Sequence, residues 1–441
     1  MRAPIIAWAG LLMAAPLSAQ QPAARPVVTL TVDEAVARGL AESHRIAEAV
    51  ARGEAATAAI GQQRAASLPQ IAVLAGYTRT NHVDEFRILA PPYGLFTIYP
   101  DVPDNWRTRL DLQWPIFTSG RLDALERAAR AEAAASASDI EQTRGDLRLE
   151  IKRSYWALVT AREAIAVVQG SLDQTTEHLR DVRNQLDAGL VPPNDVSTAA
   201  AQEARQRMLL VQATVDRDVT AAALARLVGI DPNAEIVPTS ALDVRSPERQ
   251  PVGALLAEAR RARPERAGLE QRITAWDERS RAASAGRKPT VSIAAGVDYA
   301  RPNPRIFPRV DEFNESWDAS ANVTWALFDG SRSRADVAQA AANGRAARER
   351  LEEFDSVMGV EIRQRLAELN ASDAAIAAAD AEVLAANDAR RVVGNRFTAG
   401  VATSTDVIDA QVRVLQAGLD RTQSLANTRV AEARLDRALG R

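Results

Sequence analysis

Two stretches decide the fold: residues 106–116 read WRTRLDLQWPI, and residues 317–327 read WDASANVTWAL. In both, every second residue is mostly apolar and the residues between them are mostly polar or charged. This period-two alternation is typical of a β-strand with one apolar and one polar face. Each apolar face has a tryptophan near both ends: Trp106 and Trp114 in the first stretch, Trp317 and Trp325 in the second.

The spacing of these tryptophans predicts strands of membrane length. Eight residues span roughly 26 Å along a strand, or roughly 20 Å along the membrane normal once the strand is tilted. Tryptophan at both interfaces is typical of the aromatic girdles of membrane β-barrels. The alternative is an amphipathic sheet over a soluble core. The paired tryptophans and the export signal described below favour the barrel.

The same stretches reveal an internal repeat. The tryptophans recur at an offset of 211 residues, and so do Gly189 as Gly400 and Asp195 as Asp406. Upstream the offset is 220, so the first copy has nine extra residues in a predicted surface loop. We expect a first copy at 20–229, an irregular proline-rich connecting segment at 230–262, and a second copy at 263–441.

Each copy is predicted to contain a helix, two strands, a long helix, a tip and a further helix. Residues 119–186 and 331–397 lack proline and carry apolar residues at heptad-like spacing. Each would form roughly 100 Å of helix, a length that signals coiled-coil packing. The other expected elements are strands at about 70–81, 105–116, 289–300 and 316–327, loops at 82–104 and 302–315, tips at about 187–194 and 398–405, and shorter helices at about 31–67, 195–228, 264–287 and 405–439.

Four strands are too few to close a barrel. About eight is the minimum, and open strand edges are not tolerated in lipid. If these strands lie in a membrane, several chains must therefore share one barrel. Two chains would supply eight strands and three would supply twelve, and strand counting alone leaves both open.

Residues 1–19 predict export from the cytoplasm. Arg2 is followed by an apolar run and then by the small residues Ser18 and Ala19, the pattern of a secretory signal peptide cleaved near Ala19.

Composition narrows the chemistry further. The 441 residues carry a formal net charge of −3 and no cysteine, which argues against a nucleic-acid partner and excludes disulfides and thiolate metal sites. His44, His82 and His178 lack metal-ligand spacing and are expected on the surface or in loops. Neither a nucleophile elbow nor a phosphate loop is present, so we expect no enzyme, no metal and no cofactor.

Two motifs are the most specific: WALFDGSR at 325–332, where a strand meets a helix, and FTAGVATSTDVID at 397–409. With Leu68-Pro69 and Lys288-Pro289 before strands, they resemble the TolC family of outer-membrane efflux channels. The resemblance implies a mainly α-helical chain with a transmembrane β-barrel. In a homotrimer, four strands per chain would form a twelve-stranded barrel in outer-membrane lipid, and long helical hairpins would form a tunnel in the periplasm. It also implies a periplasmic adaptor and an inner-membrane pump as partners, and passive export in efflux or type I secretion.

The resemblance also implies a site at the periplasmic tip, where acidic residues of the second repeat form rings that close the tunnel. By position these match Asp406 and Asp409. Asp406 has the counterpart Asp195, so the simpler role for both is to favour a helix N-terminus. Asp409 has no acidic counterpart, which suits a special role, and mutual repulsion in a ring would raise both pKa values.

Glycines mark the other expected turns. Gly189 and Gly400 are predicted to end the helices before each tip. The resemblance implies that these two glycines and Asp195 lie at the adaptor contact. Gly120 and Gly330 are predicted as strand-to-helix hinges. The rival readings are a periplasmic adaptor and a structural coiled-coil protein of the cell envelope, neither of which explains two copies with tryptophan-bracketed strands.

Overall fold

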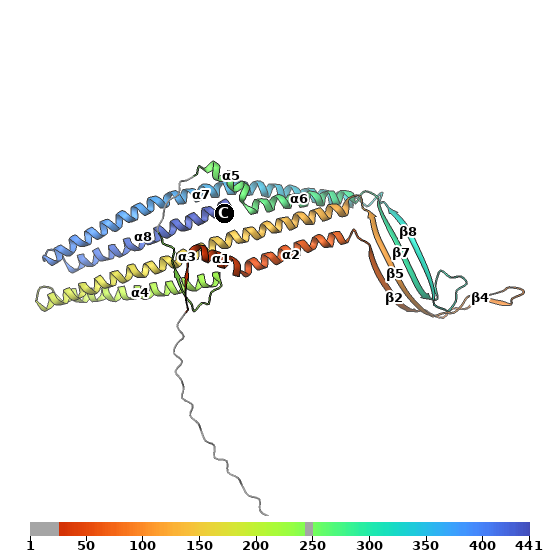
Figure 1. Cartoon of the computed structure of the whole chain (residues 1–441), viewed down its shortest axis with the longest axis horizontal. Coiled ribbons are helices and arrows are strands. Elements are labelled where there is room, and N and C mark those ends of the chain that lie inside the picture. Colours follow the sequence, from red (N-terminus) through yellow and green to blue (C-terminus); the bar gives the residue numbers. More distant parts are fainter. Residues whose placement is uncertain (1–25, 243–249) are drawn as a thin grey trace, which may run out of the picture.

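The computed structural model describes residues 26–242 and 250–441. The chain forms a long rod of helices with an antiparallel sheet inclined to it at one end (Figure 1). The expected signal peptide at 1–19 lies outside the described residues.

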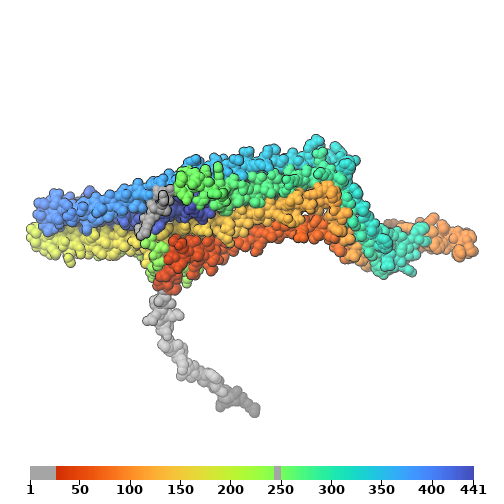
Figure 2. All heavy atoms as spheres, turned by 45° about the horizontal axis from the view of Figure 1, so that its top comes forward, coloured from red at the N-terminus to blue at the C-terminus, as the bar shows by residue number. Residues whose placement is uncertain are grey.

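The two copies contain corresponding helices of equal length. The long helices have 67 residues each and the helices after the tips have 36 each. These are α3 (Arg121–Asp187), α7 (Arg332–Thr398), α4 (Pro193–Val228) and α8 (Ser404–Leu439). The two tips lie side by side at the end of the rod opposite the sheet (Figure 2).

The helix predicted at about 31–67 is interrupted, which corrects the prediction. It consists of α1 (Val32–Glu42) and α2 (His44–Ala65). Ser43 between them has extended backbone, and its hydroxyl accepts a hydrogen bond from the Ile46 amide. This contact between a serine hydroxyl and the amide three residues later is typical of a helix N-cap.

The described residues of the connecting segment 230–262 include regular elements, a second correction. It contains β6 (Glu235–Pro238) and α5 (Val252–Ala262), and α5 is followed by α6 (Pro264–Ala285). The pair α5 and α6 repeats the lengths of α1 and α2, 11 and 22 residues. Arg263 has the extended backbone that Ser43 has in the first copy, so the repeated structure begins before residue 263.

One four-stranded antiparallel sheet contains the strands predicted from alternation. Its order is β2 (Gln70–Arg79), β5 (Asp104–Phe117), β7 (Thr290–Arg301) and β8 (Asn314–Thr324). Many of its apolar side chains are exposed, including all four tryptophans that bracket the strands. The prediction of a mainly helical chain with four strands in one sheet is confirmed.

Four shorter strands were not predicted. β1 (Val27–Leu30) pairs in parallel with β6 beside α3. In the loop expected at 82–104, β3 (Phe86–Leu89) and β4 (Leu95–Tyr99) form a hairpin that projects beyond the sheet (Figures 1 and 2). Its turn is closed by a hydrogen bond from the Ala90 amide to the Gly94 carbonyl, 2.8 Å, and Gly94 has a φ of +87°.

From the tips to the far end of the main sheet, the chain is a single layer four elements wide, which we call the wall. The order across the wall is β2-β5-β7-β8 at one end, α2-α3-α6-α7 next to it, and α4-α3-α8-α7 toward the tips (Figure 1). One edge therefore consists of β2, α2 and α4, and the other of β8 and α7. The main core lies where α3 meets α1, α4 and the β1–β6 pair, around the fully buried Tyr155.

Candidate functional site at the tips and on the sheet

Both tips are built on the same turn. After α3, Gly189 has a φ of +71°, and the Leu190 amide donates to the Gln185 carbonyl at 2.8 Å. After α7, Gly400 has a φ of +72°, and the Val401 amide donates to the Arg396 carbonyl at 2.9 Å. The pattern is a Schellman motif, whose left-handed position favours glycine. It leaves an apolar side chain exposed at each tip, 75% for Leu190 and 62% for Val401.

Asp406 is occupied by a capping role. Its carboxylate accepts hydrogen bonds from the Thr403 amide and hydroxyl, both 2.8 Å, while the Thr403 hydroxyl accepts from the Asp406 amide at 3.2 Å. This reciprocal pair is a capping box. Asp195 lies in the first turn of α4, where the N-cap residue is Pro192 and no side chain caps the helix. The two aspartates match in position but not in contacts.

The hydrogen bonds from Thr403 lower the pKa of Asp406 because they stabilise its charged form. This direction is opposite to the rise expected of a repelling ring. Within one chain, the capping contacts determine the pKa of Asp406.

Asp409 is exposed one turn further along α8. No hydrogen bond or ion pair of its side chain is found within residues 26–242 and 250–441. Residues three apart are neighbours on a helix surface. Asp406 and Asp409 therefore place two carboxylates on one face of α8 at the tip, and among the described residues only that of Asp406 has a hydrogen-bond partner.

His178 is buried beneath the tip, contrary to the surface or loop position predicted for it. It is 5% exposed in α3, its Nε2 lies 2.9 Å from the Ser404 hydroxyl of the second copy, and its ring lies 5.2 Å from that of Phe397. Burial lowers its pKa, against a smaller opposing effect of Asp181. The sequence offered no signal for this contact between copies.

The strand-to-helix hinges each contain two consecutive residues with positive φ. In the first copy these are Ser119 (+53°) and Gly120 (+80°), and in the second Gly330 (+65°) and Ser331 (+72°). At the offset of 211, Gly120 corresponds to Ser331 and not to Gly330. The hinge therefore needs two left-handed residues. Sequence reasoning identified one glycine per copy and missed the serines.

The tryptophans at the helical end of the sheet make equivalent contacts. The indole Nε1 of Trp114 donates to the Ser67 carbonyl and that of Trp325 to the Arg287 carbonyl, both 3.2 Å. At the far end, Trp106 packs against Tyr77 with ring centroids 4.5 Å apart. Trp317 is mostly exposed.

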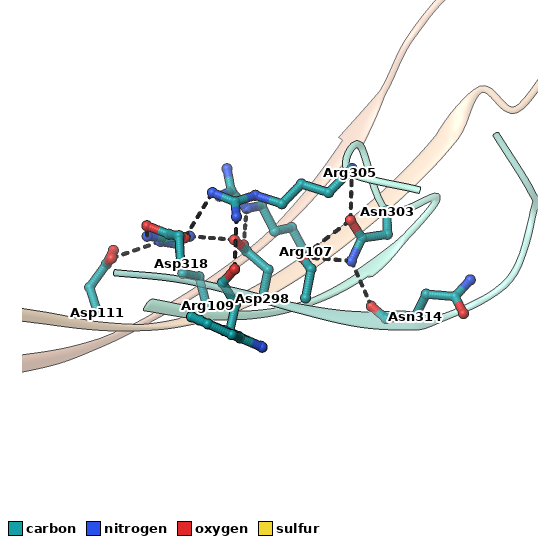
Figure 3. Close-up of polar contacts among 10 residues, drawn as sticks. Arg107, Arg109, Asp111, Asp298, Asn303, Arg305, Asn314 and Asp318 are labelled. Atoms are coloured by element: carbon teal, nitrogen blue, oxygen red, sulfur yellow. Dashed lines mark hydrogen bonds and ion pairs between the residues drawn. The ribbon is translucent and has the colours of Figure 1, made fainter. Parts of the chain in front are cut away.

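The polar face of the sheet carries an ion-paired group that alternation alone did not reveal (Figure 3). The Arg109 guanidinium bonds Asp111 (2.7 Å) and Asp318 (2.8 Å) and also Asp298, so it links β5, β7 and β8. Arg107 donates to Asp298 at 2.6 Å. We call this set, completed by Arg305 on Asp318, the polar-face cluster.

Gly296 makes this arrangement possible. Arg109 crosses β7 directly above Gly296, and a Cβ at that position would overlap its guanidinium. Gly76, the counterpart of Gly296 in the first copy, has open space at the same place. Packing therefore requires glycine at position 296 but not at position 76.

Within the described part of the chain, no group of three histidine or acidic side chains is placed to bind a metal ion. None of the helices in residues 26–242 and 250–441 is long and apolar enough to cross a membrane.

Comparisons with known proteins agree with this architecture. The family model described as outer membrane efflux protein matches residues 36–230 and 255–441. Protein CyaE of Bordetella pertussis is 26% identical over 411 residues, which cover 90% of this chain and 83% of CyaE. Outer membrane protein TolC of Escherichia coli is 24% identical over 400 residues, which cover 88% of this chain and 77% of TolC.

The likeness extends to solved structures. The outer membrane protein VceC of Vibrio cholerae matches with a TM-score of 0.75 and 21% identity, over 93% of this chain and 96% of VceC. At that identity the match establishes the fold.

The overlap at Gly296 predicts a difference between two matched variants. Gly296→Ala should lower the free energy of unfolding by about 1–3 kcal/mol, because the added methyl forces Arg109 out of the polar-face cluster. Gly76→Ala, on the equivalent strand, should change it little. Thermal unfolding of the detergent-solubilised protein measures both, and equal effects of the two variants would refute the role given to Gly296.

The capping box predicts a pH-dependent helix start. Because the pKa of Asp406 is lowered, its stabilisation is present above the ordinary aspartate pKa and is lost as pH falls through the lowered value. Amides in the first turn of α8 should thus lose hydrogen-exchange protection at strongly acidic pH. Asp406→Ala should remove that protection at neutral pH, while Asp195→Ala should leave α4 unchanged. Unchanged exchange in Asp406→Ala would contradict the capping role.

Proposed function

The chain belongs to the outer membrane efflux protein family, and on that premise we propose that Asp406 and Asp409 of three identical subunits surround the periplasmic entrance of one channel. The chain is an outer-membrane component of a tripartite efflux or type I secretion system. Its helical part lies in the periplasm, and its partners are a periplasmic adaptor and an inner-membrane pump. Membership of this family disfavours the reading as an adaptor or an envelope coiled coil.

The exposed edges of the wall support closure of the sheet and the rod by further subunits. Every residue of the edge strand β2 is exposed, and so is most of β8. In the helical part, α4 exposes an apolar stripe at helical spacing: Met208, Val211, Val215 and Val219. The opposite edge, α7, exposes Leu384 and Val392. In a homotrimer, twelve strands would close the barrel, and α7 of each subunit would face α2 and α4 of the next subunit.

The placement of the tryptophans fits this assembly. Their exposed side chains lie on the apolar face of the sheet, where a closed barrel meets lipid. Trp114 and Trp325 would lie at the periplasmic interface, near the helices, and Trp106 and Trp317 at the outer one. The polar-face cluster would then line the interior.

The tips are proposed to combine two roles. The turns at Gly189 and Gly400 present Leu190 and Val401 as exposed apolar groups, which suit contact with the adaptor. Asp195 lies beside the first of these turns. Asp409 would point a carboxylate into the mouth, and Asp406 would add a second carboxylate while it caps α8. We propose passive conduction and no catalysis, because the family and the structures that the chain resembles are channels.

The single observation that carries the entrance proposal is the unpaired, exposed carboxylate of Asp409 on the same face as Asp406. Rings of carboxylates attract cations. Asp409→Asn should lower the cation-to-anion permeability ratio and weaken block by a trivalent lanthanide ion added at the tip side, measured in planar bilayers. Asp195→Asn, which removes a charge at the other tip, is the matched control.

An unchanged permeability ratio and unchanged block in Asp409→Asn would rule out the entrance role. Equal losses in both variants would mean that only the total tip charge matters. Asp409 is the sharper test than Asp406 because its substitution leaves the capping box intact.

A further inference from the structure

A cavity of about 370 Å³ lies on the polar face of the sheet, away from the tips. Its apolar lining includes Leu74 of β2 and the two prolines of the loop after β7, Pro302 and Pro304. Its charged lining consists of three arginines, Arg107, Arg109 and Arg309, and no carboxylate lines it. We call it the Arg309 cavity.

The loop after β7, which forms one wall of this cavity, is fixed by a buried asparagine. Asn303 is 1% exposed, and its amide nitrogen donates to the Asn314 carbonyl at 2.9 Å and to the Ser316 hydroxyl at 3.0 Å (Figure 3). Its side-chain oxygen accepts from the Arg305 amide at 2.9 Å. Hydrogen bonds therefore hold this loop against β8, so the cavity has an ordered wall.

Arg309 is positioned by neutral groups only. Its guanidinium lies over the Tyr99 ring, 5.1 Å from the centroid, and donates to the Tyr99 hydroxyl and to the Asn105 side-chain oxygen at 3.1 Å. Its backbone amide donates to the Ile98 carbonyl at 3.3 Å. Within residues 26–242 and 250–441, it forms no ion pair. A guanidinium has five N–H donors, so several remain for a ligand.

The other two arginines do not cancel this charge. Arg107 and Arg109 are neutralised by carboxylates that lie beneath them: Asp298 is 5% exposed at its side chain, while Arg107 is 56% exposed. Three guanidinium groups therefore line the cavity, and among the described residues only that of Arg309 has no carboxylate partner. Two of these arginines come from β5 and the third from the loop after β7, so three groups converge on one space.

We infer that the Arg309 cavity binds a small organic anion that has an apolar body and one carboxylate. Guanidinium groups match carboxylates bidentately. The volume lies in the usual range of ligand pockets, and the apolar lining with few polar groups is typical of them. The position of this cavity in the channel rests on the proposed function. If the polar face lines the conduit, the bound anion is a solute in transit.

Calorimetric titration of the detergent-solubilised protein with 2-naphthoate tests this inference, with 2-naphthalenemethanol as the neutral analogue. The unmodified protein should bind the carboxylate and bind the alcohol at least about tenfold more weakly, since a charge-assisted hydrogen bond contributes about 1.5–3 kcal/mol. Arg309→Gln should weaken naphthoate binding by roughly tenfold or more.

Arg87→Gln is the matched control. Arg87 lies at the same end of the sheet, in the β3–β4 hairpin outside the cavity, and its loss changes the net charge equally. It should change naphthoate binding by less than about twofold, a difference below RT ln 2. Arg309→Lys keeps the charge but loses the planar fork, so it should fall between the unmodified protein and Arg309→Gln. It also gives a folded variant should the glutamine variant fail to assemble.

Any of four results would overturn the inference: unchanged binding in Arg309→Gln, no loss in Arg309→Lys, equal weakening in Arg87→Gln, or equal binding of the alcohol and the carboxylate. Calorimetry does not require conduction. Binding without conductance in bilayers would count against the channel alone, and conductance without binding would count against the Arg309 cavity alone.

Discussion

The rest of the structure depends on one constraint: a sheet with an exposed apolar face cannot lie in lipid while its edge strands are unpaired. Each unpaired backbone group there costs several kcal/mol. The duplicated unit supplies two long strands per copy, so one chain makes four strands and leaves β2 and β8 as edges. Because the helices follow the same lateral order, the exposed edges continue along α2 and α4 on one side and α7 on the other. Closing the sheet therefore also closes the rod.

Charge is balanced on the polar face of the sheet, while two charged side chains elsewhere lack an ion-pair partner among the described residues. On the polar face of the sheet, three arginines form ion pairs with three aspartates, and Gly296 leaves the room that Arg109 needs. Arg309 at the sheet and Asp409 at the tip remain unpaired within the described part of the chain. They have opposite sign and lie at opposite ends of the proposed conduit. Selection by charge would then take place at its two ends.

The sequence predicted the elements whose signal is local and repeated. Alternation around Trp106 and Trp317 located two strands of the sheet, and the repeat aligned the tips at Gly189 and Gly400. The start of α6 agrees with the prediction of a helix from residue 264. The break at Ser43 was missed because a serine cap makes it, and α5 was missed because its segment is rich in proline. The β3–β4 hairpin lies in the region of the nine extra residues, where the second copy offers no comparison.

Side-chain partners at long range could not be predicted from one sequence. The burial of His178 against Ser404 and the span of Arg109 across three strands depend on how the two copies pack together. The serines at positive φ were missed since glycine is the usual signal for that conformation, whereas Ser119 is stabilised by donating its hydroxyl to the Pro289 carbonyl at 2.6 Å.

The most direct test of closure is cross-linking between the two edge strands. The chain has no cysteine, so Ala72→Cys on β2 and Asn322→Cys on β8 introduce the only thiols. Within one chain these strands are separated by three strand spacings, roughly 14 Å, too far for a bismaleimide of about 8 Å. The account predicts a denaturing-gel ladder that ends at three chains. A ladder that ends at two, or a protein that remains monomeric under cross-linking, would contradict it.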